Sequence, residues 1–136
     1  MRNYLAASKA DHTLKALDSQ RRQIVVREAT QLNDMHYDPS TKEIVIDSRS
    51  ALVISDGKIQ TPVLGFLHEA AHALQDLTNP KKMGNDRLIK NQEYFNEEER
   101  RVIQNIENPA AKSLGEPQRN NHGGDPVQVG CSTCTQ

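Results

Sequence analysis

One strongly apolar segment, residues 61–79, constrains the fold more than any other part of the chain. Thr61 and Pro62 are typical of a helix start, with Thr at the N-cap and Pro at the first helical position. Asn79 and Pro80 indicate where the helix ends. Between these signals, apolar residues occupy most of the helix surface rather than one stripe, so we expect a helix that is buried on several sides.

Three polar residues interrupt this helix: His68, Glu69 and His72. Histidines four positions apart lie one turn above each other on one helical face, so both imidazoles can reach a single ion. Glu69 lies beside the first histidine, where its carboxylate can address a water on the metal without being a ligand. This is the HExxH arrangement of zinc peptidases. Because polar groups are costly to bury unpaired, we predict His68 and His72 as Zn²⁺ ligands; the alternative is a pair of hydrogen-bonded core histidines.

A catalytic zinc site needs a third protein ligand, which must come from elsewhere in the chain. A second helix is expected over residues 96–108, closed by Pro109. Glu99 falls inside the apolar face of that helix, whereas Glu98 lies near its edge. Coordination to a buried cation would explain an acid on an apolar face, so we predict Glu99 as the third ligand. The apolar face consists of Phe95, Val102, Ile103 and Ile106.

Other assignments of the third ligand stay open. Asn96 and Glu99 fit a capping box, in which the Glu99 side chain reaches back to the start of the helix and needs no metal. Glu98 would then be the better ligand. Glu116 and His122, further along the chain, are additional alternatives.

Arg119 and His122 lie in a polar segment after the second helix. A zinc peptidase must stabilise the oxyanion of its tetrahedral intermediate, and an Arg or His near the metal can do so. By itself the segment is equally typical of a solvated loop. We therefore treat Arg119 and His122, together with Glu69, as candidate catalytic residues.

The rest of the chain predicts an α+β domain. A short amphipathic helix is expected over residues 12–22, and the segments 81–92 and 115–136 favour loop. We expect one domain over residues 1–127, followed by a flexible tail over residues 128–136. In that domain a small, mostly antiparallel sheet packs on the 61–79 helix. Its strands are expected from residue 24 and over residues 35–37, 43–47 and 51–54.

Charge and hydropathy exclude several kinds of partner. Seventeen Lys and Arg nearly balance eighteen Asp and Glu, which gives no argument for binding nucleic acid or an anionic membrane. No window approaches the roughly 18 apolar residues of a membrane span, and the N-terminus lacks the apolar run of a secretory signal. We expect a soluble protein, cytoplasmic or exported without a signal peptide. Cys131 and Cys134 are the only cysteines, and we predict two thiols in the tail rather than a disulfide.

Three segments in this order resemble a known family: the HEAAH helix, the helix FNEEERRVIQNIEN and the segment GEPQRNNH. The combination is similar to the small HExxH effector metallopeptidases of bacteria. These include the NleD-like proteins delivered by type III secretion, and toxin domains carried on type VI spike (VgrG) and Rhs proteins. The resemblance covers about residues 61 to 124. It implies a minimal zincin-like fold of the gluzincin pattern, with zinc held by His68, His72 and a glutamate of Glu98-Glu99, and with Glu69 as general base.

The resemblance also implies a role for Arg119 and His122. They match an Arg-x-x-Tyr or Arg-x-x-His element, similar to the one that clostridial neurotoxin proteases use near the transition state. The implied activity is a secreted zinc endopeptidase that cleaves proteins or peptides of a target cell, with a secretion apparatus or an immunity protein as further partners. Two alternatives are a zinc amidase that acts on cell wall and a non-catalytic structural or binding module.

Overall fold

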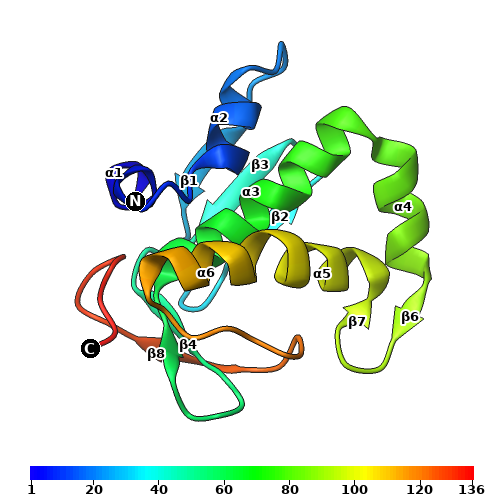
Figure 1. The fold of residues 1–136 in the computed structure, drawn as a ribbon. Helices are drawn as coiled ribbons and strands as arrows, with labels where there is room; N and C mark the ends of the chain where they lie inside the picture. The colour runs from blue at the N-terminus through cyan, green and yellow to red at the C-terminus, as the bar shows by residue number, and fades with distance from the viewer.

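Helix α3 (Pro62–Thr78) runs through the centre of the fold, as its apolar surface predicts. The computed structural model describes residues 1–136, and the other elements surround this helix (Figure 1). Eleven of its 17 residues are buried, and both histidines of the HExxH motif are among them. Whatever those histidines contact is therefore held in place by the core of the domain.

Two small sheets, rather than one, pack against α3. The first is mixed and the second is antiparallel throughout. In the first, β3 pairs parallel with β1 and antiparallel with β2; in the second, β4 pairs antiparallel with both β5 and β8. The last strand comes from a segment predicted as loop, because Pro126 and the glycines before it are typical of turns. The bounds are β1 (Val25–Glu28), β2 (His36–Asp38), β3 (Glu43–Ile46), β4 (Ser50–Val53), β5 (Ile59–Gln60) and β8 (Asp125–Gln128).

The chain leaves the first sheet and enters the second at Asp47, which is buried. Its carboxylate accepts hydrogen bonds from the backbone N–H groups of Asn33 (2.9 Å) and Arg49 (3.0 Å). Gln128 of β8 also donates to this carboxylate. One buried acid thus fixes the turn between β3 and β4 and the end of β8.

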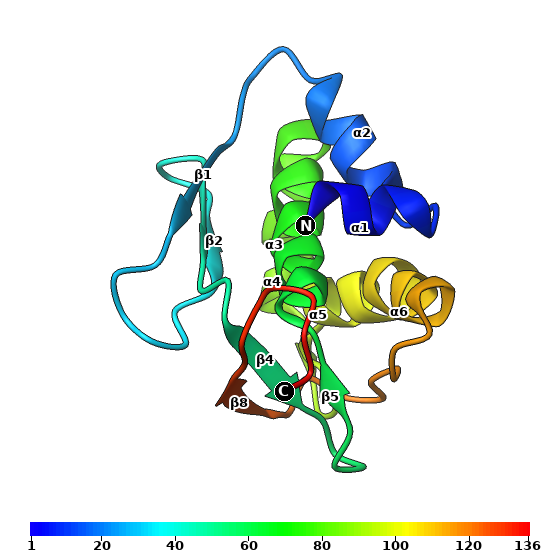
Figure 2. The ribbon, with the colours of Figure 1, turned by 90° about the vertical axis from the view of Figure 1, so that its left-hand side faces the viewer.

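Helices α1 (Arg2–Ala7) and α2 (His12–Asp18) cover the side of α3 that faces away from the first sheet (Figure 2). The second of these confirms the helix predicted from residue 12, although it ends four residues before residue 22. The core around α3 is aliphatic, as the low aromatic content requires. Its most buried members include Leu5, Leu14, Ile44, Val63, Leu64, Leu67, Ala70 and Ala73.

The predicted loop over residues 81–92 is wrong, since helix α4 (Pro80–Leu88) occupies most of it. Asn79 and Pro80 end α3 and also start α4: the Asn79 side chain accepts a hydrogen bond from the N–H of Lys82, and Pro80 takes the first turn. Met83 is the buried residue of this helix. A hairpin follows, formed by β6 (Lys90–Asn91) and β7 (Phe95–Asn96).

The second predicted helix is present but does not end at Pro109. It continues from α5 (Glu97–Val102) through one π-helical segment, η1 (Ile103–Glu107), into α6 (Asn108–Leu114). In the wide turn the N–H of Asn108 donates to the carbonyl of Ile103, five residues back. This break in the α-helical pattern lets a proline, which has no N–H, begin a new α-helical segment. Gly115, in the left-handed conformation, ends it.

The C-terminal segment folds back onto the start of α3. Cys131 and Cys134 form a disulfide, so the prediction of two free thiols is wrong. The backbone carbonyl of Ser132 accepts a hydrogen bond from the N–H of Val63, and Val129 is buried. Pairing of the cysteines depends on this local fold, which sequence spacing does not reveal. None of the helices is both long and apolar enough to cross a lipid bilayer.

Candidate metal centre

Two histidines and one glutamate converge in the interior, beside the middle of α3. The Nε2 atom of His68 lies 2.9 Å from Oε2 of Glu99 and 3.0 Å from Nε2 of His72. Nε2 of His72 lies 3.4 Å from the same Glu99 oxygen. One ligand atom from each of the three residues therefore fits within 4.8 Å of the others, which is a group that could hold a metal ion.

The opposite edge of each imidazole contacts a second carboxylate. Nδ1 of His68 lies 2.8 Å from Oε2 of Glu107, and Nδ1 of His72 lies 3.0 Å from Oε1 of Glu98. Both glutamates are fully or almost fully buried. A carboxylate behind a histidine fixes the ring so that its other nitrogen faces a metal. Both rings are thus oriented with Nε2 toward Glu99.

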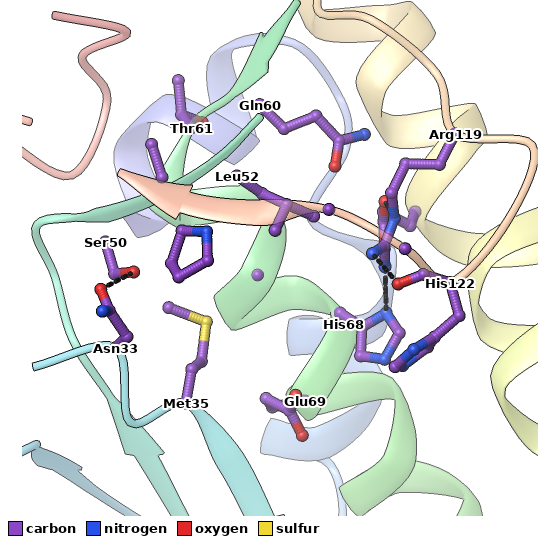
Figure 3. Close-up of a pocket in the computed structure, with 16 residues that line it drawn as sticks. Asn33, Met35, Ser50, Leu52, Gln60, Thr61, His68, Glu69, Arg119 and His122 are labelled. Atoms are coloured by element: carbon purple, nitrogen blue, oxygen red, sulfur yellow. Dashed lines mark hydrogen bonds and ion pairs between the residues drawn. The ribbon is translucent and has the colours of Figure 1, made fainter. Parts of the chain in front are cut away.

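Each of these carboxylates is paired in turn with an arginine. Arg119 donates two hydrogen bonds to Glu107, at 2.7 and 2.6 Å, and Arg101 donates two to Glu98, at 2.9 and 2.7 Å. Figure 3 shows the Arg119 guanidinium above His68, and its Nη2 lies 3.3 Å from Nδ1 of that ring. Arg119 therefore contacts the Nδ1 edge of His68, and it also lines the cavity that opens beside this histidine.

The charge of this cluster calls for a cation or for protons. Glu98, Glu99 and Glu107 supply three carboxylates, whereas Arg101 and Arg119 supply two guanidiniums. Burial tends to raise the pKa of Glu98 and Glu107, but the arginines and histidines outweigh it and lower both values to about 2. The pKa of Glu99 is lowered as well, because the surrounding imidazoles outweigh its burial. All three acids are therefore ionised, and one negative charge is left to balance.

The imidazoles can supply that balance as long as no metal is present. Burial lowers the pKa of His68, but hydrogen bonds to Glu107 and Glu99 outweigh it and raise the value to about 10. The pKa of His72 is raised despite its burial, through Glu98 and Glu99. A divalent cation at the Nε2 atoms would have to displace protons from these rings. Two imidazoles and one carboxylate form one of the ligand sets found in open zinc sites.

The capping interaction at the start of α5 does not compete with this site. The Asn96 side chain accepts a hydrogen bond from the N–H of Glu99, which is half of the capping box. The Glu99 carboxylate does not return to Asn96 but points to the histidines. Glu98, the alternative ligand, lies behind His72, and Glu116 lies at the start of α3, where it accepts hydrogen bonds from Thr61. Among the proposed third ligands, Glu99 is the one that meets both Nε2 atoms.

A cavity of about 450 Å³ opens beside His68. Glu69 lines it and makes no hydrogen bond or ion pair with another side chain, and His122 closes it from the other side (Figure 3). The His122 side chain is 46% exposed, and its Nε2 lies 3.4 Å from Oε2 of Glu99. Four sequence-predicted residues thus share one cavity: His68, Glu69, Arg119 and His122. Its remaining walls come mainly from β4, β5, the first turns of α3, the segment before β2 and the segment that leads into β8.

Sequence reasoning missed the roles of Glu98, Glu107 and Arg101 behind the histidines. A signal for Glu107 was available: it lies eight residues after Glu99, about two helical turns, and therefore on the same face. The exact alignment depends on η1, which no residue pattern announces. Arg101 follows Glu98 by three positions, a spacing at which side chains meet on a helix.

No protein-family model, curated protein or solved structure matched the chain. The metal centre is therefore inferred from its own residues and distances.

Proposed function

We propose that this protein is a zinc-dependent endopeptidase, with His68, His72 and Glu99 as the zinc ligands. The observation that carries the proposal is the meeting of these three side chains, of which His68 lines a cavity that also contains an unpaired carboxylate, Glu69. A purely structural cluster has no need for an open cavity or a free acid. The resemblance of residues 61–124 to bacterial effector metallopeptidases supports the same activity and adds the proposal of a secreted toxin or effector.

The proposed mechanism divides the work among three side chains. A bound zinc ion would polarise the scissile carbonyl and lower the pKa of a water toward about 7. Glu69 accepts a proton from the attacking water and transfers it to the leaving amine nitrogen as the C–N bond breaks. His122, at the exposed edge of the cavity, donates a hydrogen bond to the developing oxyanion. Arg119 acts as a positioning residue, through Glu107 and His68.

Digestion of an unfolded protein such as casein tests this function. We expect zinc-loaded protein to cleave it, a chelator to stop cleavage, and Glu69→Gln to lower turnover by roughly 100-fold or more while the protein keeps its zinc. Glu43→Gln, on β3 and away from the cavity, is the matched control and should leave turnover unchanged. Near wild-type cleavage by a folded Glu69→Gln variant would contradict the mechanism.

A further inference from the structure

Phe95 lies in an unusual position for an aromatic residue. It is 72% exposed, although its neighbours Tyr94 and Asn96 are buried, at 6% each. Tyr94 precedes β7 and Asn96 belongs to it, so the exposed Phe95 ring lies between two buried residues. Only 4% of the residues are aromatic, and one of the two phenylalanines is thus exposed on the surface.

The backbone at Phe95 is also strained. Its φ is +71°, in the left-handed region that Gly and Asn adopt far more readily than an aromatic residue. Such strain persists where the surrounding structure holds it, and it is concentrated at functional sites. Neither packing nor backbone geometry therefore accounts for a phenylalanine here, which suggests that its ring serves another purpose.

The Phe95 ring is connected to the metal centre through His122. The two ring centroids lie 6.1 Å apart with the planes tilted by 33°, and the N–H of His122 donates to the carbonyl of Glu93 in the same hairpin, at 2.9 Å. Leu88, at the end of α4, is 82% exposed beside the hairpin. Phe95, Leu88 and His122 line a second cavity of about 660 Å³.

The two cavities meet at His122. One contains Glu69 and the other contains Phe95, and His122 lines both. An extended polypeptide that crosses His122 would therefore place one flank near Glu69 and the other against Phe95 and Leu88. Exposed apolar residues beside a polar reaction site are typical of a surface that receives apolar side chains.

We propose that Phe95 and Leu88 dock a large apolar side chain of the polypeptide substrate, in the cavity that does not contain Glu69. This inference rests on the proposed peptidase function and deepens it, because it selects peptide bonds that have a bulky apolar residue on one fixed side. Phe95 is a specificity-determining residue and takes no part in the bond-breaking step.

Mass spectrometry of the casein fragments tests this proposal with three variants. Phe95→Asn removes the ring and suits the left-handed backbone, Phe95→Tyr keeps the ring, and Val25→Ala is a control at an exposed apolar residue of β1. We expect wild-type protein, Phe95→Tyr and Val25→Ala to prefer bonds flanked by a large apolar residue. Phe95→Asn should lose the preference and cleave those bonds about 10-fold more slowly, with an unchanged zinc content and a higher thermal midpoint.

A binding measurement separates this inference from the proposed function. The dipeptide acetyl-Leu-Leu-amide is titrated into ¹⁵N-labelled protein, and amide shifts are followed at Phe95 and His122. Shifts at these residues without any cleavage of casein would overturn the peptidase and leave an apolar peptide-binding surface. If Phe95→Asn cleaves casein at the same bonds as wild type, the docking proposal alone is overturned. A lower thermal midpoint of the Phe95→Asn variant would overturn it as well. Concentration-dependent dimers in sedimentation, abolished by Phe95→Asn, would instead assign the surface to a second copy of the chain.

Discussion

Helix α3 carries two buried polar clusters that differ in one respect. Near its middle, His68 and His72 meet Glu99. One turn after His72, Asp76 accepts hydrogen bonds from the Tyr37 hydroxyl, at 2.6 Å, and from the Lys42 ammonium group. The Asp76 cluster joins α3 to the β2–β3 hairpin, and none of its three side chains lines either cavity.

The difference lies in which groups meet in each cluster. In the Asp76 cluster a carboxylate meets a hydroxyl and an ammonium group, and nothing more is required. In the metal centre two Nε2 atoms lie 3.0 Å apart beside a carboxylate, with their Nδ1 edges already engaged. The Asp76 cluster stabilises the fold, whereas the metal centre brings together three ligand atoms that could hold a cation. Mutations should separate these two roles.

The largest expected effect is on metal binding. His72→Ala removes a ligand, so we expect the zinc affinity to fall by roughly 1,000-fold, more than the 10–100-fold that accompanies loss of an outer carboxylate. Competition with a chromogenic chelator measures this. His36→Ala, at an exposed histidine, is the control and should bind zinc as wild type does. Equal affinity in the two variants would remove the distinction between the clusters.

The next effect is on stability. Asp76→Ala leaves the buried Tyr37 hydroxyl and the Lys42 ammonium group without their partner, so we expect a loss of about 3 kcal/mol in the free energy of unfolding. Asp76→Asn keeps an acceptor for Tyr37 and should lose less. Urea denaturation gives both values. The folded Asp76→Ala variant should still bind one zinc ion, and a parallel loss of zinc would show that the clusters are not independent.

A smaller effect is expected behind the ligands. Glu107→Gln keeps the size of the side chain but weakens its hold on His68 and Arg119, so the zinc affinity should fall by about 10-fold. The same chelator competition measures it, with Glu93→Gln in the exposed hairpin as control. No change in affinity would mean that Glu107 orients nothing at the metal.

The smallest effect concerns Asp47, which lies outside both clusters. Burial tends to raise its pKa, but the N–H groups of Asn33 and Arg49 outweigh it and lower the pKa. A carboxyl group with a lowered pKa in the folded protein stabilises the fold at any pH above its ordinary, unfolded-state pKa. This contribution is lost as the pH falls from that value through the lowered pKa of the folded state. We expect Asp47→Asn to lose about 1 kcal/mol at pH 7, with a difference from wild type that narrows on acidification. A constant difference in urea titrations across that range would contradict this.

The sequence was sufficient for residues whose positions follow from one regular helix. His68 and His72 are one turn apart in α3, and helical periodicity favoured Glu99 of α5 as the third ligand, with Glu98, Glu116 and His122 as alternatives. The roles of Glu69 and His122 in catalysis stay predictions. What periodicity predicts is which side of a helix a residue occupies, not which nitrogen of a ring it will contact.

Other features could not be predicted because their signals have two meanings. Asn79-Pro80 ends one helix and begins the next, and Pro109 follows a π-helical segment instead of stopping the helix. The strand β8 and the disulfide between Cys131 and Cys134 form where the chain folds back on α3. In each case a tertiary contact decides between local alternatives that the residues leave equal.

Metal analysis of the purified protein tests the central claim most directly. After incubation with zinc and extensive dialysis, elemental analysis should give one zinc ion per chain, and X-ray absorption spectroscopy should show two imidazole ligands and at least one oxygen ligand. A wild-type chain that stays metal-free while folded, or zinc bound without imidazole ligands, would contradict it.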